Sequence, residues 1–355
     1  MVVSGYYGFG NAGDELILGV LCEVLAGHRV TVLSADPAAT RRLHGVEAVP
    51  RLSVGGVLRA LAGADLLVSG GGGLLQDHTG PGSVPYYLGI ILAARLLGCR
   101  VLIYAQGIGP LRRRWSRASL GLLRGVAGAS VRDPESAEIL NRFGVRGVEV
   151  TADAALCLPR PPRVAPEEVP ELAGLARGAG PVLAVAPRPY GGAGFTRDLA
   201  LAVDEAVERD GARVVLVPMQ RREDVVACQA LRATMRHAAL LLPAEIPARR
   251  YPALFGSFDV VLGMRLHALI LAALARVPGV GLSYDPKISA FVQALGPDLV
   301  DLPLNSAPER IRGALLERLA QAPDRQEALD AAVRRLQGVA QRNNLLLRSL
   351  LPPAP

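Results

Sequence analysis

Residues 66–77 read LLVSGGGGLLQD. A short continuous apolar run is followed at once by four glycines, which is typical of a buried strand that ends in a loop at a sheet edge. Comparable apolar runs recur in the first half at 30–33, 101–104 and, more briefly, 148–150. Helix-like stretches lie between them at 14–26, 86–97, 116–127 and 135–143. This alternation predicts a parallel sheet covered by helices on both faces.

The second half repeats the alternation, with predicted strands at 182–186, 214–217, 240–242, 260–262 and 280–282 and predicted helices at 197–209, 221–236, 249–255 and 266–275. Between the halves, residues 159–170 hold five prolines in twelve positions, which excludes a helix or a central strand. We therefore predict the α/β class, with two doubly wound, Rossmann-like domains. The expected boundaries are an N-terminal domain over 1–158, a proline-rich linker over 159–178, a C-terminal domain over 179–306 and a helical C-terminal tail over 307–355.

The composition of the 355 residues is that of a globular protein, with 50% hydrophobic and 20% charged residues. The most apolar stretch, 88–104, is interrupted by Arg95 and Arg100, and 266–275 is too short for a membrane span of ~20 residues. The first residues lack the basic and apolar regions of a signal peptide. We expect a cytoplasmic protein, with the inner face of the membrane as an alternative.

The net charge of +7 and the pI near 9.6 favour anionic partners. Aromatic residues make up only 4% and do not alternate with basic ones, so a nucleic-acid partner is not expected. Lys287 is the one lysine among 39 basic residues. The four cysteines are scattered without a CxxC pair, and we predict neither a disulfide framework nor a metal site.

A glycine motif near the N-terminus, residues 5–15, has the spacing of a dinucleotide fingerprint at Gly8, Gly10 and Gly13, with Asp36 following 23 residues later. Asp14 and Glu15 argue against that function, because two carboxylates at a helix N-terminus repel a phosphate. Two interpretations stay open. The motif is a tight turn with Asp14 as helix cap, or Asn11 and Asp14 bind a sugar by hydrogen bonds.

Two further loops follow predicted strands of the first half. The four glycines 70–73 exceed what a turn needs, so we expect Gly71 and Gly72 to let a ligand approach the main chain, with Asp77 placed to bind a hydroxyl. Gln106, in AQGIGP, is a candidate contact for a hydroxyl or acetamido group, and a plain turn is the alternative.

Basic residues follow three predicted strands of the second half. Arg188 lies between two prolines and can bind a carboxylate or phosphate. Arg265 and His267 lie at a strand–helix junction, where the arginine can hold an anion and the histidine can exchange a proton. Lys287 follows the next strand and can neutralise a phosphate.

A basic run, residues 111–117, contains the chain's one tryptophan, Trp115. A solvated face is the ordinary explanation of such a run. Contact with a membrane surface or a lipid-linked acceptor is the alternative.

Taken in order, these motifs resemble the polysaccharide pyruvyl transferase family, and most closely the branch that pyruvylates secondary cell-wall polymers of bacteria with surface layers. The resemblance rests on GFGNAGDE (8–15), 70–77, 105–110, VRD (131–133), TAD (151–153), GMRLH (263–267) and DPK (285–287). It implies a GT-B-like fold and the transfer of pyruvate from phosphoenolpyruvate to a sugar as a cyclic ketal, commonly on N-acetylmannosamine. Arg265 and His267 match the family's donor motif, and Arg188 is similar to a second donor-binding arginine.

The residues fit that chemistry. Arg188, Arg265 and Lys287 supply cations for the carboxylate and phosphate of phosphoenolpyruvate, and His267 is the candidate acid or base, with Asp14 or Asp77 orienting the acceptor. No cofactor is expected besides the co-substrate. The partners are a glycan acceptor, free or lipid-linked, and a homo-oligomer is an open alternative.

Three other functions remain open at this stage. A GT-B glycosyltransferase would use the same fold with a nucleotide-sugar donor. A non-catalytic glycan- or nucleotide-binding protein would keep the site without turnover. An NAD-dependent oxidoreductase is disfavoured by Asp14 and Glu15.

Overall fold

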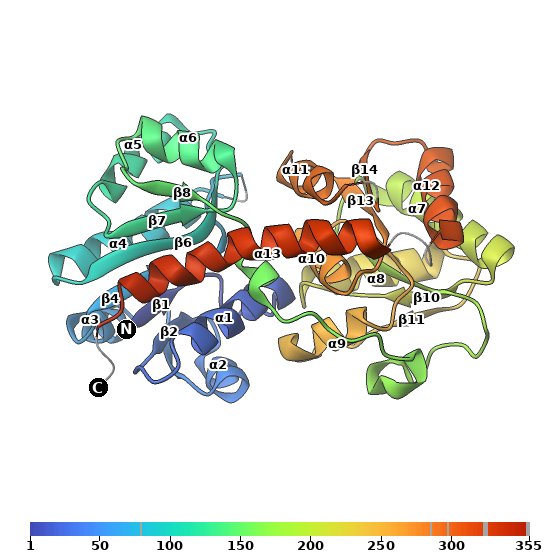
Figure 1. Ribbon diagram of the computed structural model, residues 1–355, viewed down its shortest axis with the longest axis horizontal. Coiled ribbons are helices and arrows are strands. Elements are labelled where there is room, and N and C mark those ends of the chain that lie inside the picture. Colours follow the sequence, from blue (N-terminus) through green and yellow to red (C-terminus); the bar gives the residue numbers. More distant parts are fainter. Residues whose placement is uncertain (79, 285, 297, 322–325, 353–355) are drawn as a thin grey trace. The chain divides into compact units, whose positions relative to one another are not determined.

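The computed structural model describes residues 1–78, 80–284, 286–296, 298–321 and 326–352, without the side chains of 286, 287, 321 and 326 (Figure 1). The chain forms two compact units. Unit 1 comprises Met1–Leu158 together with the residues from Leu336 on, and unit 2 comprises Pro159–Arg335.

Unit 1 is built on a parallel sheet of eight strands in the order β3-β2-β1-β4-β6-β7-β8, with β5 paired to β6 beyond that path. The strands are β1 (Val2–Ser4), β2 (Thr31–Ser34), β3 (Glu47–Pro50), β4 (Leu66–Ser69), β5 (Gly72–Leu75), β6 (Arg100–Ile108), β7 (Gly128–Val131) and β8 (Val148–Val150). The helices are α1 (Ala12–Val24), α2 (Pro37–His44), α3 (Val54–Ala62), α4 (Ser83–Leu96), α5 (Arg114–Ser119), the 3-10 helix η1 (Leu120–Leu123), α6 (Pro134–Arg142) and η2 (Ala154–Cys157).

Unit 2 contains a second parallel sheet, of six strands in the order β11-β10-β9-β12-β13-β14. The strands are β9 (Val182–Ala186), β10 (Arg213–Leu216), β11 (Ala239–Leu241), β12 (Val260–Gly263), β13 (Gly279–Ser283) and β14 (Leu299–Pro303). Its helices are η3 (Pro166–Glu168), η4 (Pro170–Leu172), α7 (Gly192–Asp210), α8 (Glu223–Thr234), η5 (Ala248–Arg250), α9 (Tyr251–Phe255), α10 (Leu266–Leu274), α11 (Pro286–Leu295) and α12 (Pro308–Gln321).

Both sheets change winding direction once, and this positions the candidate site. In unit 1 the chain starts at β1, moves outward to β3 and then returns to β4 on the other side of β1. In unit 2 the same change occurs between β9 and β12. Loops diverge at such a switch point and leave a crevice at the carboxyl ends of the strands, where doubly wound sheets bind ligands.

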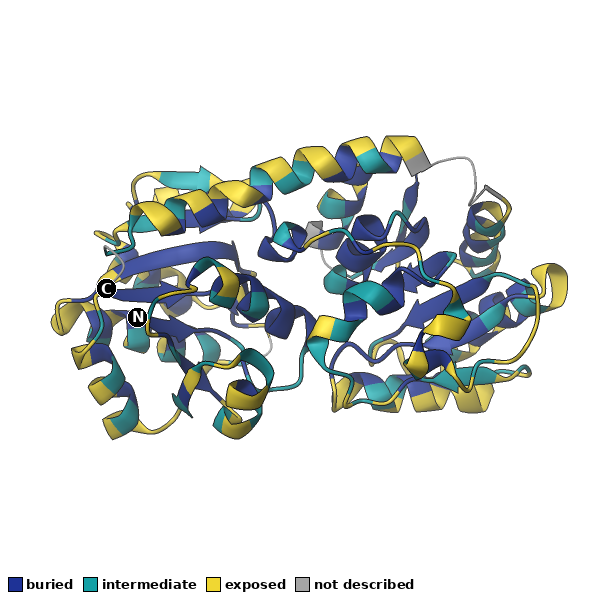
Figure 2. Ribbon diagram, turned by 60° about the horizontal axis from the view of Figure 1, so that its bottom comes forward, coloured by how far each residue is buried: buried dark blue, intermediate teal, exposed yellow. Residues whose placement is uncertain are grey.

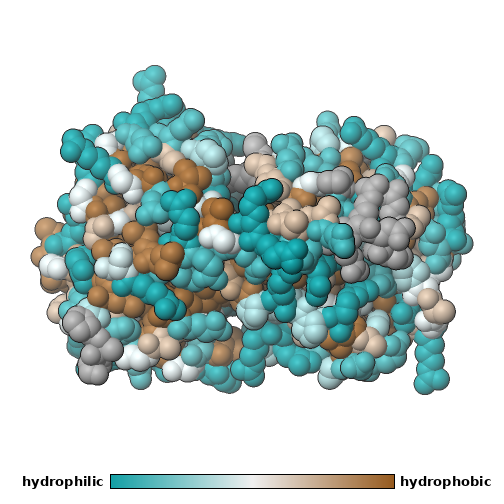
Figure 3. Space-filling view, in the orientation of Figure 1, coloured by the Kyte–Doolittle hydropathy of each residue, from teal (hydrophilic) through white to brown (hydrophobic). Residues whose placement is uncertain are grey.

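The central strands are apolar along their whole length because helices cover both faces of each sheet. In the burial colours of Figure 2 the strands are almost entirely buried, while the outer sides of the helices are exposed. Figure 3 shows apolar side chains that nevertheless reach the surface of unit 1 in several places.

The sequence prediction missed several elements. Strands β3, β5, β7 and β14 and helices α2, α3 and α11 were not expected. Residues 116–127, expected as one helix, form the end of α5 and then η1, and Gly128 begins β7. The short strands lack a run of β-branched residues long enough to stand out, and tertiary pairing rather than propensity defines them.

The proline-rich segment is packed rather than extended. It forms η3 and η4 within unit 2, Leu172 is buried, and Glu171 accepts two hydrogen bonds from Arg250, at 2.8 and 2.9 Å. The last helix, α13 (Gln326–Ser349), begins in unit 2 and its residues from Leu336 on pack in unit 1. In the described residues, no helix combines the length and the hydropathy that a membrane crossing needs.

Candidate functional site

Two basic residues meet at the switch point of unit 2. Arg188 follows β9 by two residues, and Arg265 follows β12 by two residues. The two strands are neighbours, and the last residues of each, Ala186 and Gly263, are paired. The topology therefore brings Arg188 and Arg265 to one edge of the sheet, as their positions after predicted strands suggested.

Arg265 is held by two carboxylates. Its Nε and Nη2 donate to Asp224, which is fully buried in the first turn of α8, with the shortest distance 2.6 Å. Nη2 also donates to Glu223, at 3.3 Å. Burial acts to lower the pKa of the Arg265 guanidinium, but Asp224 and Glu223 beside it outweigh burial and raise that pKa above its ordinary value. Arg265 is a permanently charged, fixed group that still has Nη1 to donate.

Arg188 has a different environment. Its guanidinium carbon lies 4.1 Å from the centre of the Tyr284 ring, a cation–π contact, and its backbone amide faces Met264 Sδ at 3.4 Å. Its Nε is buried and has no hydrogen-bond partner among the residues that the structure describes. A buried donor on a cation without a carboxylate partner is costly unless an anion binds it.

His267 and Lys287 complete the predicted donor residues. His267 is half-buried in the first turn of α10, two residues after Arg265. Lys287 is the second residue of α11, which follows β13, but its side chain and the whole of Asp285 lie outside the described residues. The position of the lysine ammonium group stays a prediction.

The corresponding edge of unit 1 begins with the glycine motif. Asn11, not Asp14, caps α1: its Oδ1 accepts from the amides of Gly13 (3.0 Å) and Asp14 (3.3 Å). Glu15 accepts from the Gly8 amide at 2.7 Å and faces His44 Nε2 at 3.0 Å. The backbone amides of Gly8, Gly13 and Asp14, which a dinucleotide phosphate would need as donors, are therefore already bonded within the protein.

Asp36, the fingerprint's expected ribose contact, caps α2 by accepting from the Ala39 amide at 2.9 Å. The glycine spacing that resembles a dinucleotide fingerprint is therefore explained by the turn before α1 and by the cap of α2.

The glycines after β4 are explained mostly by packing inside the protein. A methyl group on Gly70 would come within 2.1 Å of the Tyr7 hydroxyl, one on Gly71 within 3.1 Å of Ile17, and one on Gly72 within 2.7 Å of Asp14 Oδ1. Only Gly73 is both exposed and open on this side. The expectation that four glycines exceed the structural need was wrong for three of them. Asp14 is buried against this row, 7% exposed.

Gln106 lies at the centre of a buried polar cluster under the glycine row. Its Nε2 donates to the carbonyl and to the hydroxyl of Ser69, at 3.0 and 2.7 Å, and it is fully buried. Its Oε1, like the hydroxyls of Tyr7 and Ser4, is buried without a partner in the described part of the chain. Buried polar groups without a partner are rare in proteins, so these three distinguish this part of unit 1 from most of its core.

Asp77 has a structural function that the sequence did not reveal. Its two carboxylate oxygens accept from the amides of Arg112 (2.7 Å) and Arg113 (2.9 Å), and Arg113 donates back to the Asp77 carbonyl at 2.8 Å. Burial acts to raise the pKa of Asp77, but these bonds outweigh burial and lower the pKa below its usual value. The carboxylate fixes the basic loop before α5, and both of its oxygens are engaged there.

Several residues of these edges escaped sequence reasoning. Asp224 ends a charged run, residues 221–224, that leads into α8, and Gln220 directly precedes this run. Charged runs of this kind are common at the start of helices. Arg132 bonds Asp153 at 2.8 Å, a pair that joins the VRD and TAD motifs. No signal in the sequence separated Asp224 from other helical carboxylates, whereas the paired motifs could have suggested the Arg132–Asp153 contact.

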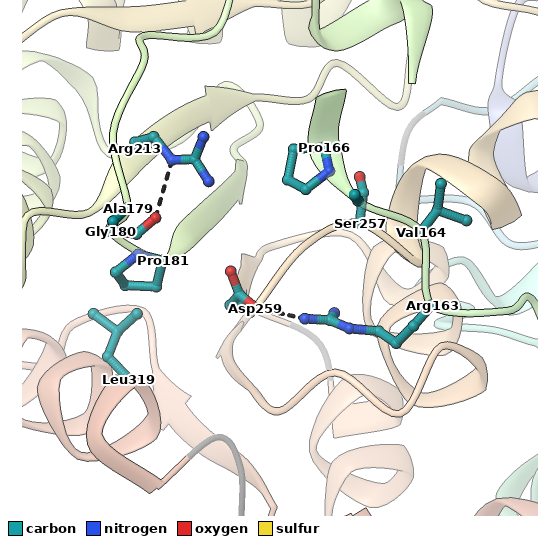
Figure 4. A pocket seen from close by; sticks show the side chains of 11 residues that line it. Arg163, Val164, Pro166, Ala179, Gly180, Pro181, Arg213, Ser257, Asp259 and Leu319 are labelled. Carbon is teal, nitrogen blue, oxygen red and sulfur yellow. Dashed lines mark hydrogen bonds and ion pairs between the residues drawn. The ribbon is translucent and has the colours of Figure 1, made fainter. Parts of the chain in front are cut away.

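The described residues contain no group of three or more histidine, cysteine, aspartate or glutamate side chains that could hold a metal ion. A pocket in unit 2, shown in Figure 4, lies at the amino ends of β9, β10 and β12, away from Arg188 and Arg265. Arg213 donates to the Gly180 carbonyl and Arg163 pairs with Asp259 there, so its charged groups already have partners.

Comparisons with known proteins agree with this architecture. Structures that cover nearly the whole chain include a glycosyltransferase of Rickettsia africae (10% identity, TM-score 0.64, 98% of this chain and 96% of that one) and Anabaena HepE in complex with UDP-glucose (12%, 0.64, 98% and 98%). A third is a putative UDP-N-acetylglucosamine 2-epimerase of Listeria monocytogenes (14%, 0.65, 98% and 95%). At these identities the likeness shows the fold, which is GT-B-like, as expected.

No curated protein sequence gives a significant match. A family model, polysaccharide pyruvyl transferase, matches residues 11–286, which spans both edges described above. The chain thus belongs to the polysaccharide pyruvyl transferase family.

Proposed function

We propose that this protein transfers pyruvate from phosphoenolpyruvate to a sugar of a cell-wall polysaccharide or of its lipid-linked precursor, forming a cyclic ketal and releasing phosphate. N-acetylmannosamine is the proposed acceptor sugar. Family membership supports pyruvyl transfer to a polysaccharide. The observation that carries the donor assignment is the pair of arginines at one switch point, of which Arg188 has an unpartnered buried Nε.

Phosphoenolpyruvate suits this pair because its carboxylate and its phosphate are both attached to one carbon, C2. Arg188 supplies a cation that forms no ion pair among the described residues, and Arg265 supplies a second cation whose orientation Asp224 fixes. Charge-assisted hydrogen bonds from two fixed guanidinium groups can hold a carboxylate and a phosphate at the same time. Lys287 is the proposed third cation at the carboxyl edge of this sheet.

On balance, the proposed reaction moves two protons from the sugar hydroxyls, one to the donor carbon and one to the phosphate. A proton adds to the methylene carbon of the donor, so C2 becomes electrophilic, and one sugar hydroxyl forms a C–O bond to C2. The C2–O bond to phosphate then breaks, and a second hydroxyl closes the ring. The hydroxyls release two protons, which balance the one added to carbon and the one that leaves with phosphate.

His267 is the proposed proton carrier, since it lies two residues from Arg265 in the first turn of α10. Gln106, Asn11 and Asp14 are the proposed acceptor residues at the edge of unit 1. Gly71 and Gly72 are set aside, because packing inside the protein explains them. Asp77 is set aside as a catalytic group because backbone amides engage both of its oxygens. The proposed steps use no metal or other cofactor.

The test is turnover with phosphoenolpyruvate and a synthetic glycoside ending in N-acetylmannosamine. Phosphate release and a new ketal methyl signal in the proton NMR spectrum, in equal amounts, are expected. Arg188→Ala should lower turnover, and Arg177→Ala, an exposed arginine of unit 2, should leave it unchanged. Phosphate without ketal would contradict acceptor transfer, and turnover of a nucleotide-sugar instead would favour glycosyl transfer.

A further inference from the structure

The positive charge of this protein is concentrated in one segment. Residues 78–132 contain eight arginines and no aspartate or glutamate. The remaining 300 residues contain 31 basic and 32 acidic side chains, so they are close to neutral. The net charge of +7 therefore arises in α4, α5, η1 and the strands between them.

This segment and the neighbouring helix α3 expose large apolar side chains. Of the thirteen such side chains exposed in the described part of the chain, eight lie in α3, α4, α5 and η1 or directly beside α3 and α4. They are Leu52, Val54, Leu58, Leu92, Leu96, Leu97, Trp115 and Leu122. Leu96 is 79% exposed and Trp115 is 46% exposed. Exposed apolar groups in such number on neighbouring helices mark an interaction surface.

These helices lie on one face of the unit 1 sheet. Helix α4 contacts α3, α5 and η1. The inner sides of α3, α4 and η1 share one buried core, in which Leu61, Leu88 and Leu120 pack together. Their outer sides therefore form a continuous layer, and Arg95 ties α4 to η1 through a 2.8 Å bond to the Leu122 carbonyl.

Exposed arginines are interleaved with the apolar groups. Arg95 and Arg100 flank Leu96 and Leu97, and Arg112, Arg114 and Arg117 surround Trp115. The nearest carboxylates in sequence are Asp77, whose oxygens accept from the backbone amides of Arg112 and Arg113, and Asp133, which caps α6. Glu135 and Glu138 on α6 line a pocket together with Arg114 and Arg117. Arginine, leucine and tryptophan on one face are the composition of helices that lie in the interface of an anionic bilayer.

We propose that this layer, the outer side of α3, α4, α5 and η1, docks unit 1 onto an anionic lipid bilayer. The apolar side chains enter the boundary between headgroups and acyl chains, and the arginines bind lipid phosphates. Each arginine near an anionic leaflet strengthens partitioning about fivefold, so several act together. The docking is independent of the donor and of the reaction, and it would bring an acceptor carried on lipid to unit 1.

The single tryptophan provides the test, because its emission reports on this layer alone. The full-length protein is mixed with vesicles of phosphatidylglycerol or of phosphatidylcholine, and sedimentation and tryptophan emission are measured. We expect co-sedimentation and a blue-shifted emission with phosphatidylglycerol, both weakened by high salt because charge attraction is screened. Brominated acyl chains should quench the emission.

Variants locate the contact. Arg112→Gln/Arg114→Gln/Arg117→Gln should weaken binding about 100-fold, and Leu96→Gln should remove part of what remains. The control Arg177→Gln/Arg232→Gln/Arg249→Gln removes the same charge from exposed positions of unit 2 and should bind like the parent.

Several results would overturn the proposal. They are no binding to phosphatidylglycerol, equal loss in both triple variants, or binding without a change in tryptophan emission. A vesicle-free dimer that Leu96→Gln dissociates would assign the layer to self-association instead. Because no donor or acceptor is present, failure here leaves the pyruvyl transfer proposal untouched.

Discussion

At the scale of the residue, the two arginines of the unit 2 switch point, Arg188 and Arg265, differ in the side chains that contact them. Arg265 is fixed and largely neutralised by Asp224, whereas Arg188 stacks on Tyr284 and keeps an unpartnered Nε. The sequence placed both arginines after strands, which the topology explains. It could not distinguish their environments, because Asp224 on α8 and Tyr284 after β13 are distant in sequence and only the fold brings them to the arginines.

Asp224→Asn should weaken donor binding and stability together. The amide keeps the shape of the side chain but removes the charge that orients Arg265, so we expect a loss of about 1–3 kcal/mol in the free energy of unfolding and a raised KM for the donor. Glu223→Gln is the matched control, since Glu223 is exposed and its bond is longer. Equal effects of the two variants would refute an orienting role for Asp224.

His267→Gln should lower kcat by about 10²–10⁴, the usual contribution of a general acid or base, while the Kd of the donor changes little. In the plot of rate against pH, the change in rate that is caused by titration of His267 should disappear. Full turnover with an unchanged pH profile would exclude His267 as the proton carrier.

At the scale of the element, the strand-and-loop alternation was predictable but the loops' internal bonds were not. Continuous apolar runs identified strands such as β4, β6 and β9, because strands that are buried on both faces are apolar at successive positions. Strand β5 was missed because GGLL is short and glycine-rich. Asp77, at two residues beyond β5, was therefore assigned to a ligand instead of to the loop before α5.

Asp77→Asn tests this assignment through the pH dependence of stability. The pKa of Asp77 is lowered in the folded protein, so its charge stabilises the fold above the unfolded pKa of about 4 and this contribution is lost as the pH falls through the lower, folded value. The parent should exceed the variant by about 1–2 kcal/mol at pH 7, and the difference should shrink toward pH 3 in denaturant melts.

The exposed Asp65→Asn serves as control for this experiment. A difference between parent and Asp77→Asn that grows as the solution becomes more acidic would contradict the assignment.

At the scale of the whole molecule, two α/β units and a helical C-terminus were predictable, and the return of the last helix to unit 1 was not. Asn343, fully buried on α13, accepts from the Thr151 hydroxyl at 2.7 Å and donates to the Ala152 carbonyl at 2.9 Å. Asn344 accepts from Tyr104 at 2.6 Å. Contacts across 191 to 240 residues leave no local pattern, so the sequence showed a helix but not its partner.

Asn343→Ala should lower the free energy of unfolding by about 1–3 kcal/mol, because it takes the donor away from the buried Ala152 carbonyl. The Thr151 hydroxyl keeps the Val131 carbonyl as a partner, at 3.0 Å. Leu345→Ala, at an exposed position two residues later, should change it by less than about 0.5 kcal/mol. If the two variants had similar free energies of unfolding, the C-terminal segment would not stabilise unit 1.

The most direct test of the donor assignment is calorimetric titration of phosphoenolpyruvate into the parent, Arg188→Ala, Arg265→Ala and the control Arg177→Ala, with and without acceptor glycan. We predict binding by the parent and the control, and a loss of about 10- to 100-fold in affinity for Arg188→Ala without a loss of thermal stability. Arg265→Ala should also lose binding, with some destabilisation from the orphaned Asp224. Undiminished binding by Arg188→Ala, or a parent that binds a nucleotide-sugar and not phosphoenolpyruvate, would contradict the account.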